Sequence, residues 1–386
     1  MIPYGHQDIS EDDINAVVEV LRSDFITQGP VVPAFEGAVA NYCGCQHAVA
    51  TNSATAALHL ACLALDVGPG DCVWTSPITF VASANAALYC GARVDFVDID
   101  PKTYNLSPDR LEEKLRQADI AGALPKVIIP VHLAGQSCDM APIKRLADRY
   151  GVRLIEDASH AIGGRYHGDP VGSCKFSDIA VFSFHPVKIV TTGEGGVATT
   201  NDPGLAERLR LDRSHGITRD SALMRSTSHG PWYYEQVRLG FNYRMTDIAA
   251  ALGRSQLARL NELVDRRHEI AAAYDEAFAG LPLTVPWRQP ETRSSFHLYI
   301  VRLDLARIRR SHRAIFESLR AKGIGVNLHY IPVYKQPWYR DLGFPEAYCP
   351  EAEAYYGDAI SLPIFPGLTK AEQQRVIDVL SREVAA

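Results

Sequence analysis

Short apolar runs alternate with helix-like patterns between residues 47 and 200 of this 386-residue chain. Several runs carry no polar alternation (VIIPV at residues 127–131). A strand that is apolar on both faces belongs in a sheet covered by helices on both sides. Repeated strand–helix alternation therefore predicts an α/β fold with a mostly parallel sheet. The predicted strands are His47–Thr51, Cys72–Ser76, Arg93–Asp98, Lys126–His132, Arg153–Asp157, Ile179–Phe184 and Gly196–Thr200, with helices including Ala54–Leu65, Ser83–Tyr89 and Ala141–Tyr150 between them.

The pattern changes after about residue 255. The sequence there predicts one long helix over Leu257–Gly280, an extended segment over Ser295–Leu303, and a helix over Ser311–Lys322. A final helix is predicted from Thr369 to Val384, with Thr369 as N-cap and Glu372 as its capping-box partner. The chain is too long for one small core. We therefore expect a large domain of residues 1–255 and a smaller C-terminal α+β domain of residues 256–386.

Composition excludes some classes of partner. Lys and Arg number 39 against 45 Asp and Glu, a formal charge of −6, whereas nucleic-acid binding calls for a basic face. No apolar run reaches the roughly 18–20 residues that span a bilayer, and the first residues lack a signal-peptide pattern. The eight cysteines form no C-x-x-C pair. We expect a reduced, cytoplasmic protein without a metal site, a membrane span or a nucleic-acid partner.

Polar residues follow two of the predicted strands, at the edge where open α/β sheets bind ligands. Residues 51–57 (TNSATAA) lead from the first strand into a helix, whose free N–H groups attract an anion. Asp157 ends the strand Arg153–Asp157, and a buried carboxylate needs a partner such as a protonated pyridine nitrogen. Each feature has an ordinary alternative: the first is a common N-cap pattern, and Asp157 could simply cap the next helix.

Lys188 follows the strand Ile179–Phe184 and precedes a glycine-rich turn, residues 191–196 (TTGEGG). A lysine at the carboxyl edge of the sheet can form a Schiff base if its amine is partly deprotonated. Spacing alone does not distinguish it from a solvated surface lysine. The glycine-rich turn precedes a strand and no helix, so it is neither a dinucleotide-binding motif nor a P-loop.

Together, residues 156–161 (EDASHA), 182–188 (FSFHPVK) with 192–196 (TGEGG), and 239–245 (LGFNYRM) resemble the DegT-type sugar aminotransferases, a family of fold-type-I pyridoxal-phosphate enzymes. The resemblance extends from Ile2 to the C-terminal helix. It implies the fold of that class, with a seven-stranded, mostly parallel sheet in the large domain, and pyridoxal 5'-phosphate as cofactor.

The resemblance also assigns roles. It implies that Lys188 is the Schiff-base lysine and proton shuttle, and that Asp157 pairs with the pyridine nitrogen, so that the ring accepts carbanion charge. Asn242 matches an asparagine that reaches the cofactor phosphate of a neighbouring subunit, which implies a homodimer with composite sites. The remaining cofactor-binding positions implied are Ala54, Thr55 and Ser183 at the phosphate, Phe80 on the ring and His160 near the phenolic oxygen.

Substrate-lining positions follow from the same resemblance. They are Tyr4, Asp24, Phe25, Ile26, Thr27, His185, His329, Tyr334, Lys335 and Gln336. Tyr4 could equally be a packed aromatic. Relatives that act at the C3 carbon of the sugar usually carry Gly-Asp-Gly-Gly after the lysine, whereas C4 enzymes more often show a histidine three residues before it and TTGEGG after it. His185 and Glu194 place this sequence with the C4 group.

Residues 2–5 (IPYG), 27–29 (TQG) and 214–216 (SHG) narrow the resemblance to the enzymes of pseudaminic acid biosynthesis. Those enzymes use L-glutamate to aminate a UDP-linked 4-keto-6-deoxy-N-acetyl-hexose, giving UDP-4-amino-4,6-dideoxy-N-acetyl-β-L-altrosamine. Another UDP- or dTDP-linked keto sugar, aminated at C4 or C3, is the alternative. A dehydratase of this family would carry histidine in place of Lys188. A non-catalytic cofactor-binding regulator is the alternative from another functional class. A nicotinamide oxidoreductase would need the motif G-x-G-x-x-G at the position where this sequence has residues 53–55 (SAT).

Overall fold

The computed structural model describes residues 1–385 and places all seven predicted strands in one sheet. The strand order is β1-β9-β8-β5-β4-β2-β3. Pairs among β8, β5, β4, β2 and β3 are parallel, whereas β9 runs antiparallel to both β1 and β8. The predicted mostly parallel α/β sheet is therefore confirmed. The strands are β1 (His47–Thr51), β2 (Cys72–Thr75), β3 (Arg93–Phe96), β4 (Val127–Ile129), β5 (Arg153–Asp157), β8 (Ile179–Ser183) and β9 (Gly196–Thr200).

Both faces of this sheet are covered, as the unbroken apolar runs predict. On β8, Ile179 and Val181 pack in one hydrophobic cluster with Ala57 of α3, while Phe182 packs in another with Phe35 of α2. Strand β4 ends before Pro130, which has no N–H group to donate to the sheet. The helices of this part are α1 (Glu11–Leu21), α2 (Val31–Cys43), α3 (Ala54–Ala64), α4 (Val81–Tyr89), α5 (Pro108–Ile120), α6 (Met140–Tyr150), α7 (Pro203–Asp212) and α8 (Asp247–Ala258).

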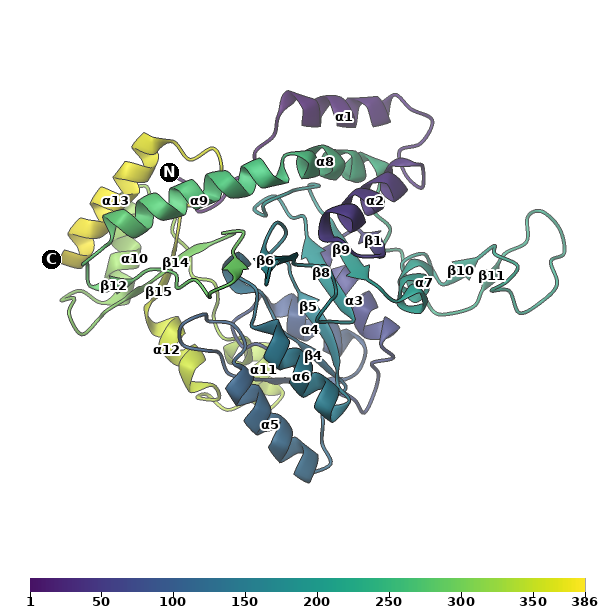
Figure 1. Cartoon of the computed structure of the whole chain (residues 1–386), viewed down its shortest axis with the longest axis horizontal. Coiled ribbons are helices and arrows are strands. Elements are labelled where there is room, and N and C mark those ends of the chain that lie inside the picture. Colours follow the sequence, from purple (N-terminus) through teal and green to yellow (C-terminus); the bar gives the residue numbers. More distant parts are fainter. Residues whose placement is uncertain (386) are drawn as a thin grey trace.

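A second, three-stranded sheet lies in the C-terminal part, in the order β12-β14-β15. Figure 1 shows α9 running from α8 towards this sheet, on the side where both chain ends lie. Tyr299 of β14 and Ile360 of β15 share a hydrophobic cluster with Tyr274 of α9. The elements are α9 (Leu260–Ala277), β12 (Leu283–Thr284), β14 (Tyr299–Leu303), α10 (His312–Ala321), α11 (Pro337–Asp341), α12 (Pro350–Asp358), β15 (Ala359–Leu362) and α13 (Lys370–Ala385).

Two C-terminal predictions need correction. The helix predicted over Leu257–Gly280 is two helices that meet at Arg259, whose N–H donates to Gln256 O in a tighter i−3 turn. The Arg259 guanidinium is fixed there by Asp8 and Asp13. The extended segment Ser295–Leu303 is a strand only from Tyr299. The capping box of the last helix is confirmed, because Thr369 Oγ1 accepts from Glu372 N–H and Glu372 Oε2 accepts from Thr369 N–H.

The division into residues 1–255 and 256–386 stays a prediction. Residue 255 lies inside α8, and strand β13 (Thr292–Arg293) of the later part pairs with β6 (Arg165–Tyr166) of the earlier part, which in turn pairs with β7 (Asp169–Pro170). Among residues 1–385, no helix combines the length and the apolar character needed to cross a membrane.

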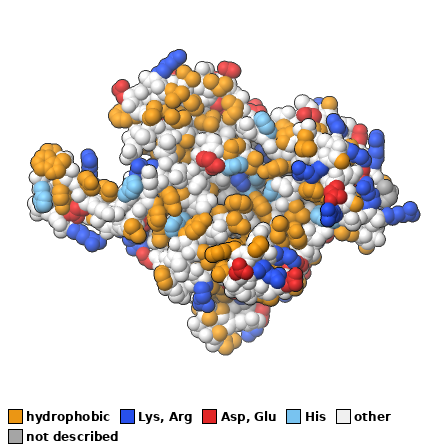
Figure 2. Space-filling model, turned by 180° about the vertical axis from the view of Figure 1, so that it is seen from behind, with side chains coloured by type: hydrophobic (Ala, Val, Ile, Leu, Met, Phe, Trp, Pro, Cys, Tyr) orange, Lys and Arg blue, Asp and Glu red, His pale blue; other side chains and the backbone are white. Residues whose placement is uncertain are grey.

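A hairpin of β10 (Ile217–Thr218) and β11 (Glu235–Gln236) projects from the body beyond α7 (Figure 1). Trp232 and Tyr234 next to it are 72% and 52% exposed. Figure 2 shows hydrophobic side chains at the tip of this projection and also over the top of the molecule, where α1 lies. Large apolar surfaces of this kind mark places where another surface binds.

Candidate active site

Lys188 lies in the connection between β8 and β9, at the carboxyl edge of the large sheet. Phe184 continues from β8, and its carbonyl accepts from Thr192 N–H at 2.9 Å and from Thr191 Oγ1 at 3.0 Å. Lys188 N–H donates to His185 O at 2.9 Å. These bonds close the connection into a compact turn, so the lysine projects from a fixed backbone.

Lys188 is half-buried in the site. Burial lowers the pKa of Lys188 to about 8, although the nearby carboxylate of Asp157 acts in the opposite direction. Nζ lies 3.5 Å from Nε2 of His297. A lysine with a lowered pKa holds a larger share of uncharged, nucleophilic amine near neutral pH.

Asp157 ends β5 beside this lysine and is only 4% exposed. Its Oδ2 accepts from the Ser83 hydroxyl of α4 at 2.5 Å, and its Oδ1 accepts from Ser159 N–H at 3.1 Å. The bond to Ser159 is a local turn bond, so the helix-capping alternative is not what this carboxylate does. A buried carboxylate held by two donors is oriented to meet a cationic partner.

The N-terminus of α3 supplies the anion-binding feature that the sequence predicts. Ser53 is the N-cap, and its hydroxyl accepts from Ala56 N–H at 3.1 Å. Gly196 of β9 lies directly against this turn, because a Cβ there would stand 2.5 Å from Ala54 N and 2.6 Å from Ser53 C. Ala54 and Thr55 are half-buried here, and Ser183 at the end of β8 is paired with Gly196 in the sheet.

A wall of rings stands over the lysine. The rings of His160 and His297 have centroids 4.3 Å apart, and Tyr330 Oη lies 3.1 Å from His160 Nε2. Phe80 is 60% exposed and its ring lies 6.3 Å from that of Tyr330. Burial, followed by the charge of Lys188, lowers the pKa of His160 well below its ordinary value.

Tyr4 and His329 extend this wall, with ring centroids 5.0 Å apart. His329 Nδ1 lies 2.8 Å from Ser361 Oγ. Burial and then the charge of Lys188 lower the pKa of His329 to about 3, so its ring is neutral. The structure thus brings these two predicted substrate residues into the neighbourhood of the lysine.

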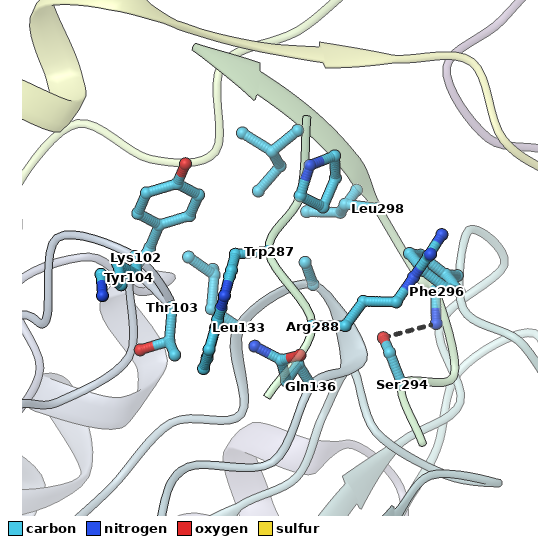
Figure 3. Close-up of a pocket in the computed structure, with 13 residues that line it drawn as sticks. Lys102, Thr103, Tyr104, Leu133, Gln136, Trp287, Arg288, Ser294, Phe296 and Leu298 are labelled. Atoms are coloured by element: carbon cyan, nitrogen blue, oxygen red, sulfur yellow. Dashed lines mark hydrogen bonds between the residues drawn. The ribbon is translucent and has the colours of Figure 1, made fainter. Parts of the chain in front are cut away.

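Behind this wall the chain is closely packed. Segment 294–298 carries His297 and docks on residues 133–136, with Ser295 N–H donating to Gly135 O at 3.0 Å and Ser295 Oγ to His160 O at 2.8 Å. Figure 3 shows the far side of the segment, where Phe296 and Leu298 face Leu133 and Trp287 across a small cavity. About 30 Å³ of that cavity is open to a water-sized sphere, which suits a water molecule or two and no larger ligand.

Other predicted residues lie elsewhere. Asp24, Phe25, Ile26 and Thr27 are exposed beside the start of α8, where Asp247 N–H donates to Ile26 O at 3.0 Å. Asp24 and Phe25 line a surface groove of about 510 Å³ between α1 and α8. Within residues 1–385 no hydrogen bond or ring contact joins these four to Lys188. His185 is exposed on the lysine turn.

Tyr334, Lys335 and Gln336 occupy a short 3₁₀ turn and the start of α11. The Tyr334 hydroxyl donates to Glu353 Oε1 at 2.7 Å, and Lys335 Nζ lies 2.6 Å from Glu353 Oε2. Tyr334 is fully buried in the large core. The polar groups of Tyr334 and Lys335 are thus already paired with Glu353, and a substrate role for these two residues and Gln336 stays a prediction.

Three residues of this site are not predicted from the sequence: Ser83, His297 and Tyr330. Ser83 lies one helical turn after Phe80 and Tyr330 follows His329, so their spacing to predicted residues was an available signal. His297 had none, because a lone histidine in an apolar segment is more often a core residue.

The cofactor implied by the resemblance fits this donor set. Lys188 offers an amine of lowered pKa, Asp157 an oriented carboxylate for a protonated ring nitrogen, and the α3 N-terminus a close-packed turn for a phosphate. Helix N-termini of this kind bind phosphate through free N–H groups.

Comparison with known proteins agrees with this geometry. SpsC of Bacillus subtilis, a spore coat polysaccharide biosynthesis protein, is 38% identical over 382 residues, covering 98% of this chain and 96% of its own. A putative sugar aminotransferase of Streptococcus pneumoniae, Spr1654, matches in its PMP form at 33% identity with a TM-score of 0.90, covering 100% of this chain and 99% of its own. Its PLP form matches with a TM-score of 0.89.

PseC of Helicobacter pylori, an aminotransferase of pseudaminic acid biosynthesis, is 32% identical with a TM-score of 0.90, covering 100% of this chain and 99% of its own. Residues 7–381 match the DegT/DnrJ/EryC1/StrS aminotransferase family. The chain therefore belongs to the DegT/DnrJ/EryC1/StrS aminotransferase family and is a pyridoxal-phosphate-dependent sugar aminotransferase.

Proposed function

We propose that this enzyme transfers an amino group from L-glutamate to C4 of a UDP-linked 4-keto-6-deoxy-N-acetyl-hexose. The product would be a 4-amino-4,6-dideoxy sugar nucleotide of the pseudaminic acid pathway. The observation that carries the proposal is the likeness to PseC over the whole chain. The C4 pattern of His185 and Glu194 supports it.

In this proposal Lys188 binds the cofactor covalently and moves protons between the two reacting carbons. Pyridoxal phosphate supplies an electron sink for carbanion charge when bound. Asp157 keeps the ring nitrogen protonated, and Ser83 fixes the carboxylate that does so. Burial supports proton transfer by Lys188, since an amine with a pKa of about 8 both accepts and gives up a proton near neutral pH.

The ring wall has a role in holding and shielding the reaction. Phe80 offers an exposed aromatic face on which a flat ring can stack. His160 is neutral, because burial keeps its pKa low. Its Nδ1 accepts from Ala134 N–H at 3.3 Å, so the proton is on Nε2, which can donate to the phenolic oxygen of the cofactor. Tyr4 and His329 are proposed to line the sugar side, with the exposed His185.

Product analysis tests the substrate. The purified enzyme is incubated with glutamate and a panel of UDP- and dTDP-linked 4-keto and 3-keto sugars, and the amino sugars are identified by mass spectrometry and NMR. We expect turnover of the UDP-linked 4-keto-6-deoxy-N-acetyl sugar above the others. Preference for a 3-keto sugar or a dTDP sugar would replace the proposed substrate with the alternative.

Lys188→Ala is the matched control for that assay. Borohydride reduction of the wild type should erase the visible absorption band and leave a fixed mass on the peptide that contains Lys188. The variant should keep its fold and show no turnover. Wild-type protein that binds the cofactor without turning over any keto sugar would favour a cofactor-binding regulator.

We also propose that the enzyme is a cytoplasmic homodimer with composite sites. Asn242 is exposed, and its carbonyl accepts from Asn52 Nδ2 at 3.4 Å beside the start of α3. Exposed apolar side chains surround this region: Leu239 is 82%, Phe25 55% and Ile26 52% exposed. A second copy of the chain would cover these side chains and receive the amide of Asn242 at its cofactor phosphate.

Mixing inactive subunits tests the composite site. Lys188→Ala and Asn242→Ala proteins are mixed under conditions where subunit exchange is verified by mass. A composite site predicts recovery towards about a quarter of wild-type activity, since half the dimers are mixed and each has one intact site of two. Verified exchange without recovery would assign Asn242 to the cofactor of its own chain.

A further inference from the structure

The strongest unexplained feature of the site is the side chain of His297. It is 3% exposed, its Nε2 lies 3.5 Å from Lys188 Nζ, and its Nδ1 is buried with no hydrogen-bond partner among residues 1–385. A buried polar nitrogen without a partner needs an explanation. None of the roles assigned to Lys188, Asp157 and the phosphate-binding turn involves the ring of His297.

The unpartnered nitrogen determines which tautomer is stable. A neutral imidazole carries its proton on one nitrogen and a lone pair on the other. A proton on Nδ1 would be a buried donor with nothing to receive it, which is the costly arrangement. The proton is therefore on Nε2, the nitrogen that faces Lys188.

An Nε2–H group can meet only one form of the lysine. An ammonium group has three donors and no acceptor, whereas the uncharged amine has a lone pair. The two nitrogens are 3.5 Å apart, at the long end of hydrogen-bond distances, and with the proton on Nε2 the form of lysine that fits is the uncharged amine. The contact thus matches an N–H donor facing an uncharged amine.

The backbone around His297 is held in place by hydrogen bonds from a buried arginine. Arg267 of α9 is only 1% exposed. Among the described residues no carboxylate forms an ion pair with its guanidinium. Its Nη1 donates instead to the carbonyls of Phe296 at 3.1 Å, Ile364 at 2.9 Å and His297 at 3.4 Å. Segment 294–298 is also tied to residues 134–135 by backbone hydrogen bonds. The ring therefore cannot easily turn to give Nδ1 a partner.

We propose that His297 is a positioning residue that favours the uncharged, nucleophilic form of Lys188 by presenting Nε2–H to the amine nitrogen. When the ammonium form loses its proton to water, both side chains are neutral and share that one hydrogen bond. The charged or titratable groups that face the pair are Asp157, His160, His329, Tyr330 and Arg267. Only Asp157 among them favours the ammonium form.

The inference rests on Lys188 as the cofactor lysine, and its test is independent of that role. Full-length, cofactor-free protein is trace-labelled with acetic anhydride across pH 6–11, and the Lys188 peptide is quantified by mass spectrometry. In His297→Leu the amine loses its donor, so we expect the labelling midpoint to rise by about half a pH unit. Labelling at pH 7 would then fall about threefold.

The direction in which the labelling midpoint of Lys188 moves distinguishes the two hydrogen-bond arrangements. A lower midpoint in His297→Leu would mean that Nε2 accepts from the ammonium, and an unchanged midpoint would mean a purely structural role; either outcome overturns the proposal. His268→Leu is the matched control, because this histidine bonds Ser294 O at 2.7 Å and packs on Phe296 at 4.9 Å without touching Lys188. Its midpoint should stay at the wild-type value.

A second measurement does not depend on the stability of the leucine variant. In histidine-selectively ¹⁵N-labelled, cofactor-free wild type at pH 9, where the Lys188 amine is largely uncharged, the His297 signals, assigned by their loss in His297→Asn, should show Nε2 protonated and Nδ1 bare. A protonated Nδ1 would refute the inference. Borohydride trapping of Lys188 tests the proposed function separately, so failure of one does not imply failure of the other.

Discussion

Gly196→Ala is the most direct test of the phosphate-binding turn. Gly196 begins β9 between Thr51 of β1 and Ser183 of β8, and the start of α3 lies across it. An added Cβ would stand 2.5 Å from Ala54 N, 2.6 Å from Ala54 Cα and 2.6 Å from Ser53 C. All three are backbone atoms, so no flexible side chain can move aside.

The size of the effect follows from these contacts. An ordinary contact begins at 3.4 Å, so the start of α3 must move by about 0.9 Å from the sheet. Overpacking of this kind costs about 1–3 kcal/mol of unfolding free energy, and three backbone contacts place it towards the upper end. Hydrogen bonds to a charged group are worth about 1.5–3 kcal/mol each. Misplacing one or two N–H groups should weaken cofactor binding roughly 10- to 100-fold.

Two assays separate the effect of Gly196→Ala on stability from its effect on cofactor affinity. Urea unfolding of the cofactor-free protein gives the stability change, and titration with pyridoxal phosphate, followed by absorbance, gives the affinity. Gly37→Ala is the control, because Gly37 lies inside α2 with nothing within 4 Å of the added Cβ. It should gain about 0.5–1 kcal/mol in stability and keep its affinity. A folded Gly196→Ala protein with wild-type affinity would refute the assignment of the phosphate to this turn.

Further predictions concern Asp157, Ser83 and Lys188. Asp157→Asn should bind the cofactor but lose about 10- to 100-fold in kcat, since an amide cannot hold the ring proton; near-wild-type turnover would reassign this carboxylate. Ser83→Ala should cost about tenfold in kcat by freeing the Asp157 carboxylate, and Ser83→Thr should restore part of it. Lys188→Met should raise the unfolding free energy of the cofactor-free protein by roughly 3 kcal/mol at pH 7. The folded-state pKa of Lys188 is lowered from 10.5 to about 8, so the wild type is fully destabilised by the buried charge below pH 8, and this destabilisation is gone by pH 10.5. If the difference in unfolding free energy between Lys188→Met and wild type did not narrow between pH 7 and pH 10, the buried charge would not be its cause.

Much of this protein was accessible from local sequence. The seven strands were predicted because apolar β-runs and turn residues are local signals, and three of the seven have the predicted bounds: His47–Thr51, Arg153–Asp157 and Gly196–Thr200. The positions of Lys188 and Asp157 at strand ends followed from the same reasoning, because the carboxyl edge of a parallel sheet gathers its ligand-binding residues.

The sequence by itself determined the sheet, the family and the residues that follow its strands. Only the tertiary structure decided what surrounds them: Ser83 on Asp157, Tyr330 on His160, and His297 on Lys188. His297 is 109 residues from Lys188 along the chain, and no periodicity or spacing encodes such a contact. It forms because Arg267 and residues 134–135 fix segment 294–298 against the large sheet, so the lowered pKa of the lysine is a product of burial between two distant parts of the chain.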